Sequence, residues 1–196
     1  MKLIAQKSTL RQIKADAVTV FVREDKKLFQ QDIVNLRKIL GKRIDTIIAL
    51  ENFKGKEAVV LSILTEKKLI APRLYLVGLG EEKKLSLESY RRASAAVARQ
   101  AQTSRIKHLA FNLPAFGQTD SGKISHAIAE GAYLSLYKFD KYQTKKKDEQ
   151  SKITEIIIFD PAESIIKDVK KELNNVRIIC EATNLARDLA NAPACE

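Results

Sequence analysis

The sequence is poor in the residues that build disulfide frameworks, metal sites and redox centres. It contains two cysteines, Cys180 and Cys195, and two histidines, His108 and His126. Two cysteines do not form a disulfide framework, and neither has a histidine or a second cysteine nearby, so free thiols are expected rather than a bridge or a metal site. The histidines stand alone in the sequence, and we expect both to be structural or solvated.

The sequence also lacks a long hydrophobic run. No apolar stretch approaches the ~20 residues that a membrane-spanning helix requires. The apolar patch within Met1–Lys7 is too short for a signal peptide. A cytoplasmic protein with no membrane partner is therefore the default expectation.

Catalytic and nucleotide-binding motifs are missing as well. Two glycines, Gly78 and Gly80, follow an apolar run, but the dinucleotide-binding fingerprint needs a third glycine where Lys83 stands. The phosphate-binding loop that ends in Gly-Lys-Ser/Thr, the Gly-x-Ser-x-Gly elbow and the His-Glu-x-x-His pair are also absent. The pattern favours a structural turn at these glycines over a nucleotide cradle.

The composition is that of an ordinary globular protein with a basic surface. Of the 196 residues, 45% are hydrophobic and 30% are charged, which is typical of a folded chain. Lysine and arginine number 35 against 24 acidic residues, so the net charge is +11. Such an excess favours nucleic acid or another anionic surface as a partner. The simpler interpretation, which we favour, is a lysine-rich solvated surface.

A strand, a glycine turn and a helix organise the chain between residues 73 and 102. The run Leu74–Val77 is rich in strand formers, and Gly78–Gly80 permits a tight turn. Ser86 is a suitable N-cap for a helix whose apolar residues recur at helical spacing as far as Ala101. This arrangement is half of a βαβ unit.

The remaining runs predict an α/β fold in which strands and helices alternate. Strands are predicted at 15–22, 46–50, 58–64, 106–113 and 153–159, and helices at 29–40, 124–131, 160–175 and 179–190. A hairpin between 46–50 and 58–64 would make the sheet mixed. Asp160 is predicted to cap the helix that follows it, with Pro161 and Glu163 in its first turn.

Three stretches resemble the N-terminal part of the leucyl aminopeptidase family, the cytosolic two-metal aminopeptidases. They are Leu74–Gly80 with the helix that follows, Glu130–Tyr142 followed by Lys145–Lys147, and Asn184–Pro193. The resemblance implies an α/β, macro-domain-like fold, with a mixed sheet flanked by helices on both faces. It divides the chain into a macro-like domain at 1–175 and, at 176–196, a connecting helix with the start of a catalytic domain.

The same resemblance implies a parent enzyme, a homo-hexamer, that removes N-terminal residues from peptides with two divalent ions, zinc or manganese. The family's metal ligands lie in its C-terminal catalytic domain, in motifs that this sequence does not contain. No catalytic, cofactor-binding or metal-binding residue is therefore assigned, and the chain is expected to be a non-catalytic part of a larger enzyme. Asp188, the most suggestive carboxylate, is expected to pair with a nearby basic group such as Arg187 or one from the next domain.

Two alternatives remain. Some bacterial relatives are reported to bind DNA, and the basic stretch Lys138–Lys147 with its aromatic residues fits a nucleic-acid-binding module. ADP-ribose binding would follow from the macro-domain-like fold alone.

Overall fold

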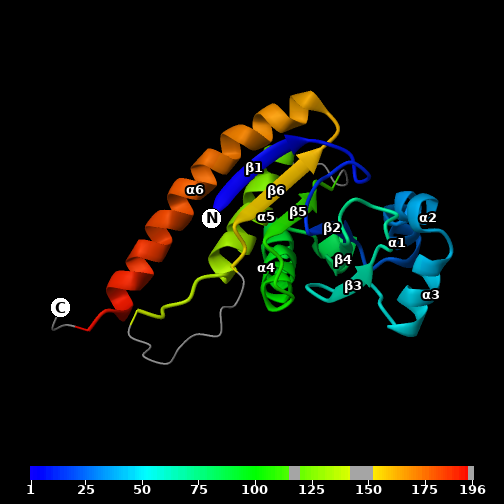
Figure 1. Ribbon diagram of the computed structural model, residues 1–196, viewed down its shortest axis with the longest axis horizontal. Coiled ribbons are helices and arrows are strands. Elements are labelled where there is room, and N and C mark those ends of the chain that lie inside the picture. The colour runs from blue at the N-terminus through cyan, green and yellow to red at the C-terminus, as the bar shows by residue number, and fades with distance from the viewer. Residues whose placement is uncertain (115–119, 142–151, 194–196) are drawn as a thin grey trace.

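One mixed sheet forms the centre of the molecule (Figure 1). The structure is a computed structural model that describes residues 1–114, 120–141 and 152–193. Within these ranges, six strands lie in the order β1-β6-β5-β2-β4-β3. The pairs β1–β6, β6–β5, β5–β2 and β2–β4 are parallel, whereas β3 runs antiparallel to β4. The strands are β1 (Lys2–Lys7), β2 (Ala17–Val22), β3 (Val60–Leu64), β4 (Arg73–Gly78), β5 (His108–Asn112) and β6 (Glu155–Asp160).

Helices cover both faces of this sheet, as the sequence predicts. The first face carries α4 (Leu87–Thr103), α5 (Ser121–Ser135) and α6 (Glu163–Asn191), and the second carries α1 (Lys26–Asp32), α2 (Val34–Leu40) and α3 (Arg43–Leu50). Strand β2 supplies both cores, because Phe21 packs on the first face while Val20 and Val22 pack on the second. A short 3-10 helix, η1 (Glu82–Lys84), precedes α4.

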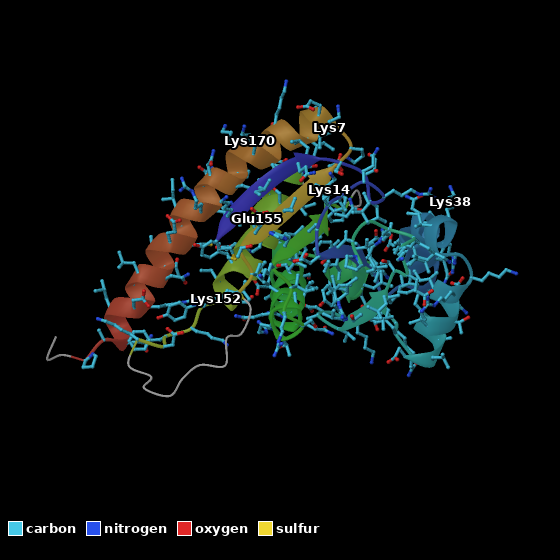
Figure 2. The ribbon with its side chains drawn as sticks, in the orientation of Figure 1. Lys7, Lys14, Lys38, Lys152, Glu155 and Lys170 are labelled. Carbon is cyan, nitrogen blue, oxygen red and sulfur yellow. The ribbon has the colours of Figure 1, made fainter. Side chains whose placement is uncertain are left out.

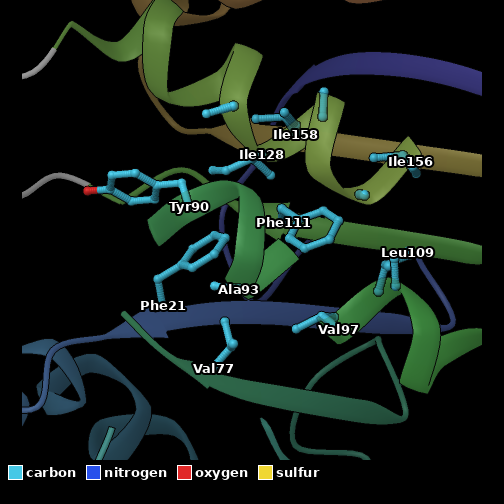
Figure 3. Close-up of a cluster of buried hydrophobic side chains, with 14 of the residues drawn as sticks. Phe21, Val77, Tyr90, Ala93, Val97, Leu109, Phe111, Ile128, Ile156 and Ile158 are labelled. Atoms are coloured by element: carbon cyan, nitrogen blue, oxygen red, sulfur yellow. The ribbon is translucent and has the colours of Figure 1, made fainter. Parts of the chain in front are cut away.

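Aromatic side chains fill the first core near the carboxyl end of β2 (Figure 3). The Phe21 ring lies 5.9 Å from that of Tyr90, edge to face, and 6.1 Å from that of Phe111, stacked. Ser86 caps α4 through a capping box with Ser89, which confirms the predicted helix start. Helix α5 approaches α4 closely at Gly131, since a Cβ there would lie 2.3 Å from the carbonyl oxygen of Arg91 on α4.

The predicted strand at 46–50 is wrong, and with it the hairpin to 58–64. These residues belong to α3, in which Ile44 is buried while Ile47 and Ile48 pack partly against the second core. The spacing of these isoleucines is helical, so packing against the sheet outweighs the strand preference of a β-branched run. The sheet is mixed for another reason, the antiparallel pairing of β3 with β4.

The predicted break at Asn174–Asn175 is wrong as well, because α6 is one helix of 29 residues. Its buried residues, Ile166, Val169, Leu173, Val176 and Cys180, are three and four positions apart on both sides of the asparagines. The two asparagines are exposed, so the helix carries them on its solvent side without interruption.

Three smaller differences concern a divided helix, a helix cap and an additional strand. The helix predicted at 29–40 is divided at Ile33 into α1 and α2. Asp160 belongs to β6 and does not cap α6, although its Oδ1 accepts a bond of 2.8 Å from the N–H of Ala162, the actual N-cap. Strand β1 was not expected, because its apolar centre is short.

None of the helices in the described ranges combines the length and apolar composition that crossing a bilayer requires.

Candidate functional site

The glycine turn after β4 is fully bonded to the rest of the chain. The three N–H groups of Gly78–Gly80 donate to the carbonyl oxygens of Val59, Val22 and Gly55, at 3.0, 2.8 and 3.0 Å. A Cβ at Gly78 would lie 2.0 Å from the carbonyl oxygen of Lys56. Because its donors are used and backbone lies against it, the turn is a packing contact and offers no cradle of free amides for a phosphate.

A buried charge cluster occupies the same end of the sheet. The Arg23 guanidinium, at the end of β2, donates through Nε and Nη2 to Asp32 of α1 at 3.1 and 2.6 Å. Its Nη1 donates to Glu82 of η1 at 2.7 Å. The hydrogen bonds to Asp32 raise the pKa of Arg23, so the guanidinium stays charged and ties three elements together.

The carboxylates of Asp16 and Glu163 have separate partners. Asp16 accepts the N–H groups of Lys107 and His108 at 2.9 and 2.8 Å, and Glu163 forms an ion pair with Lys7 at 3.5 Å. In the described part of the chain, no group of three or more histidine, cysteine, aspartate and glutamate residues is arranged to hold a metal ion.

Both histidines lie beside carboxylates. The Nδ1 atom of His108 is 3.4 Å from Asp16, and that of His126 is 3.2 Å from Glu172 on α6. His126 thus joins α5 to α6, and His108 joins the starts of β2 and β5. Cys180, the described cysteine, is a free thiol, and burial raises its pKa to about 12.

Two of the resembling stretches meet in space at the C-terminal end of α6. The hydroxyl of Tyr137, just after α5, donates to Asp188 Oδ1 at 2.8 Å, and the Arg187 guanidinium lies 5.3 Å from the centre of the Tyr137 ring. Within the described chain Asp188 therefore pairs with Tyr137 and not with Arg187, and the expected alternative, a basic group of the next domain, stays a prediction. Sequence reasoning missed this contact because tyrosine and aspartate are 51 residues apart.

The same end of α6 exposes apolar side chains. Ile178, Leu185 and Leu189 are 62%, 60% and 70% exposed. With Ala182, which is also exposed, they recur at spacings of four and three residues, so they form one stripe along the helix. We call these four residues the α6 stripe.

Basic side chains gather at the opposite end of the sheet from the glycine turn. The loops that lead into the parallel strands carry more cations than acids, and Arg11, Lys67 and Lys68 line one shallow hollow there. In Figure 2, Lys152 and Glu155 lie at the amino end of β6, and Lys7 lies at the carboxyl end of the neighbouring strand β1. The exposed cations of this amino edge are Lys2, Arg11, Lys14, Lys67, Lys68, Arg105, Lys107 and Lys152. The expected basic stretch at 138–147 is described only as far as residue 141, so Lys145–Lys147 lie outside the described residues.

The fold defines the class of protein first. The structure of this chain is similar to a macrodomain of Thermus aquaticus DarG, with a TM-score of 0.55 at 10% identity, over 82% of this chain and 99% of that one. A tomato leucine aminopeptidase mutant matches with a TM-score of 0.76 at 22% identity, over 99% of this chain and 39% of that one. The chain thus has a macro-domain-like α/β fold, as predicted.

Sequence comparison then defines the family. The profile of the cytosol aminopeptidase family, N-terminal domain, matches residues 17–146. A probable cytosol aminopeptidase of Aquifex aeolicus (strain VF5) is 35% identical over 98% of this chain and 37% of its own length. One of Alkaliphilus oremlandii (strain OhILAs) is 30% identical over 99% and 39%. The chain belongs to the cytosol aminopeptidase family, as the N-terminal domain, and it spans less than two fifths of these relatives' length.

Proposed function

We propose that this chain is the non-catalytic N-terminal domain of a leucyl aminopeptidase, and that it shapes access to the active site and supports assembly. The observation that carries the proposal is the match of nearly the whole chain to little more than a third of the Aquifex relative. The described residues of this chain offer no cluster for the implied zinc or manganese ions. On the family resemblance, we assign these ions and peptide hydrolysis to the C-terminal catalytic domain of the parent enzyme.

The α6 stripe supports a partner of this kind. Apolar side chains that are regularly spaced and exposed on one helix face mark an interaction surface. We propose that the catalytic domain of the same polypeptide covers this stripe, with residues 1–175 forming the body and 176–196 the connection. Val176 and Cys180 still pack on the body, so the connecting helix is anchored at its start. A hexameric, cytoplasmic parent rests on the resemblance.

A chimeric enzyme tests this proposal. In this chimera the chain would replace the matching segment of the Aquifex relative. Two quantities would be measured with zinc or manganese present: the rate of leucine anilide hydrolysis and the mass of the assembled particle. The chimera is expected to assemble and turn over substrate, while this chain alone shows no metal-dependent turnover. Introducing Leu185→Asp and Leu189→Asp should reduce assembly and activity, because two buried carboxylates would lack partners.

The matched control is Ile70→Asp, since Ile70 is 54% exposed and lies in the loop before β4. It should leave the chimera unaffected. Turnover by the chain alone that disappears in Asp188→Asn would contradict the proposal, as would a chimera that is indifferent to both stripe substitutions.

A second candidate function, binding of nucleic acid, is favoured by the amino edge. Its exposed lysines and arginines lie on several neighbouring loops and outnumber the acids there, Asp16, Glu66 and Glu155, which suits a phosphate backbone. Anisotropy of a labelled DNA duplex would be measured between 50 and 200 mM salt. Replacing Arg11, Lys67 and Lys68 with alanine should reduce the slope of log K against log salt by about 0.9 for each lost phosphate contact. Equal slopes for both proteins, or no binding at 50 mM salt, would reject this candidate.

A further inference from the structure

The C-terminal end of α6 is held differently from the rest of the helix. Its last fully buried residue is Cys180, and none of residues 181–193 is buried. The helix nevertheless continues to Asn191, where it extends past the sheet beside the segment that follows α5 (Figure 1). A helix end without apolar packing frays readily in water, so other contacts must hold these turns.

Polar and cation–π contacts converge on Tyr137 at this place. Its hydroxyl donates to Asp188 Oδ1 at 2.8 Å and accepts from Asn191 Nδ2 at 3.5 Å. The Arg187 guanidinium lies over the ring at 5.3 Å from its centre, and its Nη1 also donates to the carbonyl oxygen of Leu134 in α5 at 3.2 Å. The side chains of Arg187, Asp188 and Asn191, near the end of α6, thus reach one aromatic side chain and the end of α5.

The placement of Asp188 is unfavourable for the isolated helix. A negative charge near a helix C-terminus opposes the helix dipole, and the last turn of α6 contains no basic residue. The hydroxyl of Tyr137 offsets this charge with a charge-assisted hydrogen bond. The presence of Asp188 at this position is therefore explained by its bond to Tyr137 at the end of α5, and not by the stability of α6 alone.

We propose that Tyr137 is a positioning residue that latches the last three turns of α6 to the end of α5. Together with Arg187, Asp188 and Asn191 it forms what we call the Tyr137 latch. The latch fixes the direction of the helix end in this chain by itself, and so does not depend on the proposed function.

The latch also sets where the α6 stripe points. At 100° per residue, Arg187, Asp188 and Asn191 share one face of α6, and the stripe is centred roughly 140° away from it. When the latch faces the end of α5, Leu185 and Leu189 consequently face outward, in agreement with their exposure. A rigid helix end then presents the stripe to its partner already oriented, which lowers the ordering cost of binding.

Hydrogen exchange of the full chain tests the latch. In Tyr137→Phe, amide exchange over residues 184–191 should become roughly tenfold faster, while exchange in the strands stays unchanged, because a hydrogen bond to a charged group is lost locally. Tyr90→Phe is the matched control. It removes a buried hydroxyl that lacks a hydrogen-bond partner in the structure, and it should leave residues 184–191 unchanged.

A double-mutant cycle gives the second readout. Asp188→Asn keeps an acceptor at this position and should retain most of the protection, whereas Asp188→Ala should lose it. Combining Asp188→Ala with Tyr137→Phe should add little to either change, since both remove the same bond. Fully additive effects, equal exchange in Tyr137→Phe and Tyr90→Phe, or an acceleration spread equally over the strands would overturn the proposal.

Discussion

Replacing Asp32 with alanine is expected to lower the free energy of unfolding by about 3–5 kcal/mol. The Arg23 and Asp32 side chains are only 8% and 3% exposed, with 2.6 Å between Nη2 and Oδ1. Asp32 also accepts the backbone N–H of Arg23 at 2.8 Å. The alanine variant would leave a buried guanidinium without its main counter-charge, and the more exposed Glu82 would not compensate. Urea unfolding measures the loss.

The matched control is Asp45→Ala, which breaks the pair between Arg37 and Asp45. Those side chains are 32% and 41% exposed, so water solvates the remaining guanidinium and the loss should stay below about 1 kcal/mol. A double variant that replaces Arg23 with methionine and Asp32 with leucine should recover much of the stability. If Asp32→Ala costs no more than Asp45→Ala, Arg23 is solvated in the folded chain and the buried cluster is not as described.

Alkylation of Cys180 in the folded chain is expected to be at least about 10³-fold slower than that of an exposed thiol. Burial raises the pKa of Cys180 to about 12, so at pH 8 the thiolate fraction falls by roughly 10³ relative to an ordinary cysteine. The side chain is also fully buried in the core between α6 and the sheet. Iodoacetamide labelling of a Cys195→Ser variant measures the rate.

The control places a thiol two residues further along the same helix, as Ala182→Cys in a chain whose two natural cysteines are serine. Ala182 is exposed, so this thiol should react at the ordinary rate. Because the folded state favours the protonated Cys180, its contribution to stability is complete below about pH 8.5 and is lost as the pH rises toward 12. Melting temperatures should therefore decline above pH 9, and less so in Cys180→Ala. Rates within tenfold of the Ala182→Cys thiol would contradict the burial of Cys180.

The elements that the sequence predicted correctly are those whose local pattern agrees with the packing. Strand β4, its turn and α4 were recognised because an apolar run, glycines and a serine cap follow one another in order. The prediction at 46–50 failed because a short, continuous apolar run with β-branched residues fits a buried strand as well as a helix, and only contact with the sheet selects the helix. The two asparagines in α6 suggested the end of a helix, but they face solvent and do not interrupt the helix.

The candidate surfaces were less predictable, since each depends on residues distant in sequence. Family resemblance identified Glu130–Tyr142 and Asn184–Pro193 separately, but their contact through Tyr137 and Asp188 needed the fold. The net charge indicated a basic surface but not its place. The basic loops gather at one edge because they lead into parallel strands, which all start at the same edge of the sheet. Lys145–Lys147, the predicted contact residues for nucleic acid, lie outside the described residues and stay a prediction.

The length of α6 sets both how far the helix extends and the direction in which its last side chains point. Its 29 residues extend about 43 Å, and each residue added within it would turn everything beyond by roughly 100° and advance it by about 1.5 Å. One extra residue after Cys180 would therefore swing Asp188 away from Tyr137. Seven extra residues would return the direction of the Asp188 side chain to within roughly 20° of the original, but would place it about 10 Å farther from the sheet. The number of residues after Cys180 therefore sets both how far the end of α6 lies from the sheet and which way its side chains face.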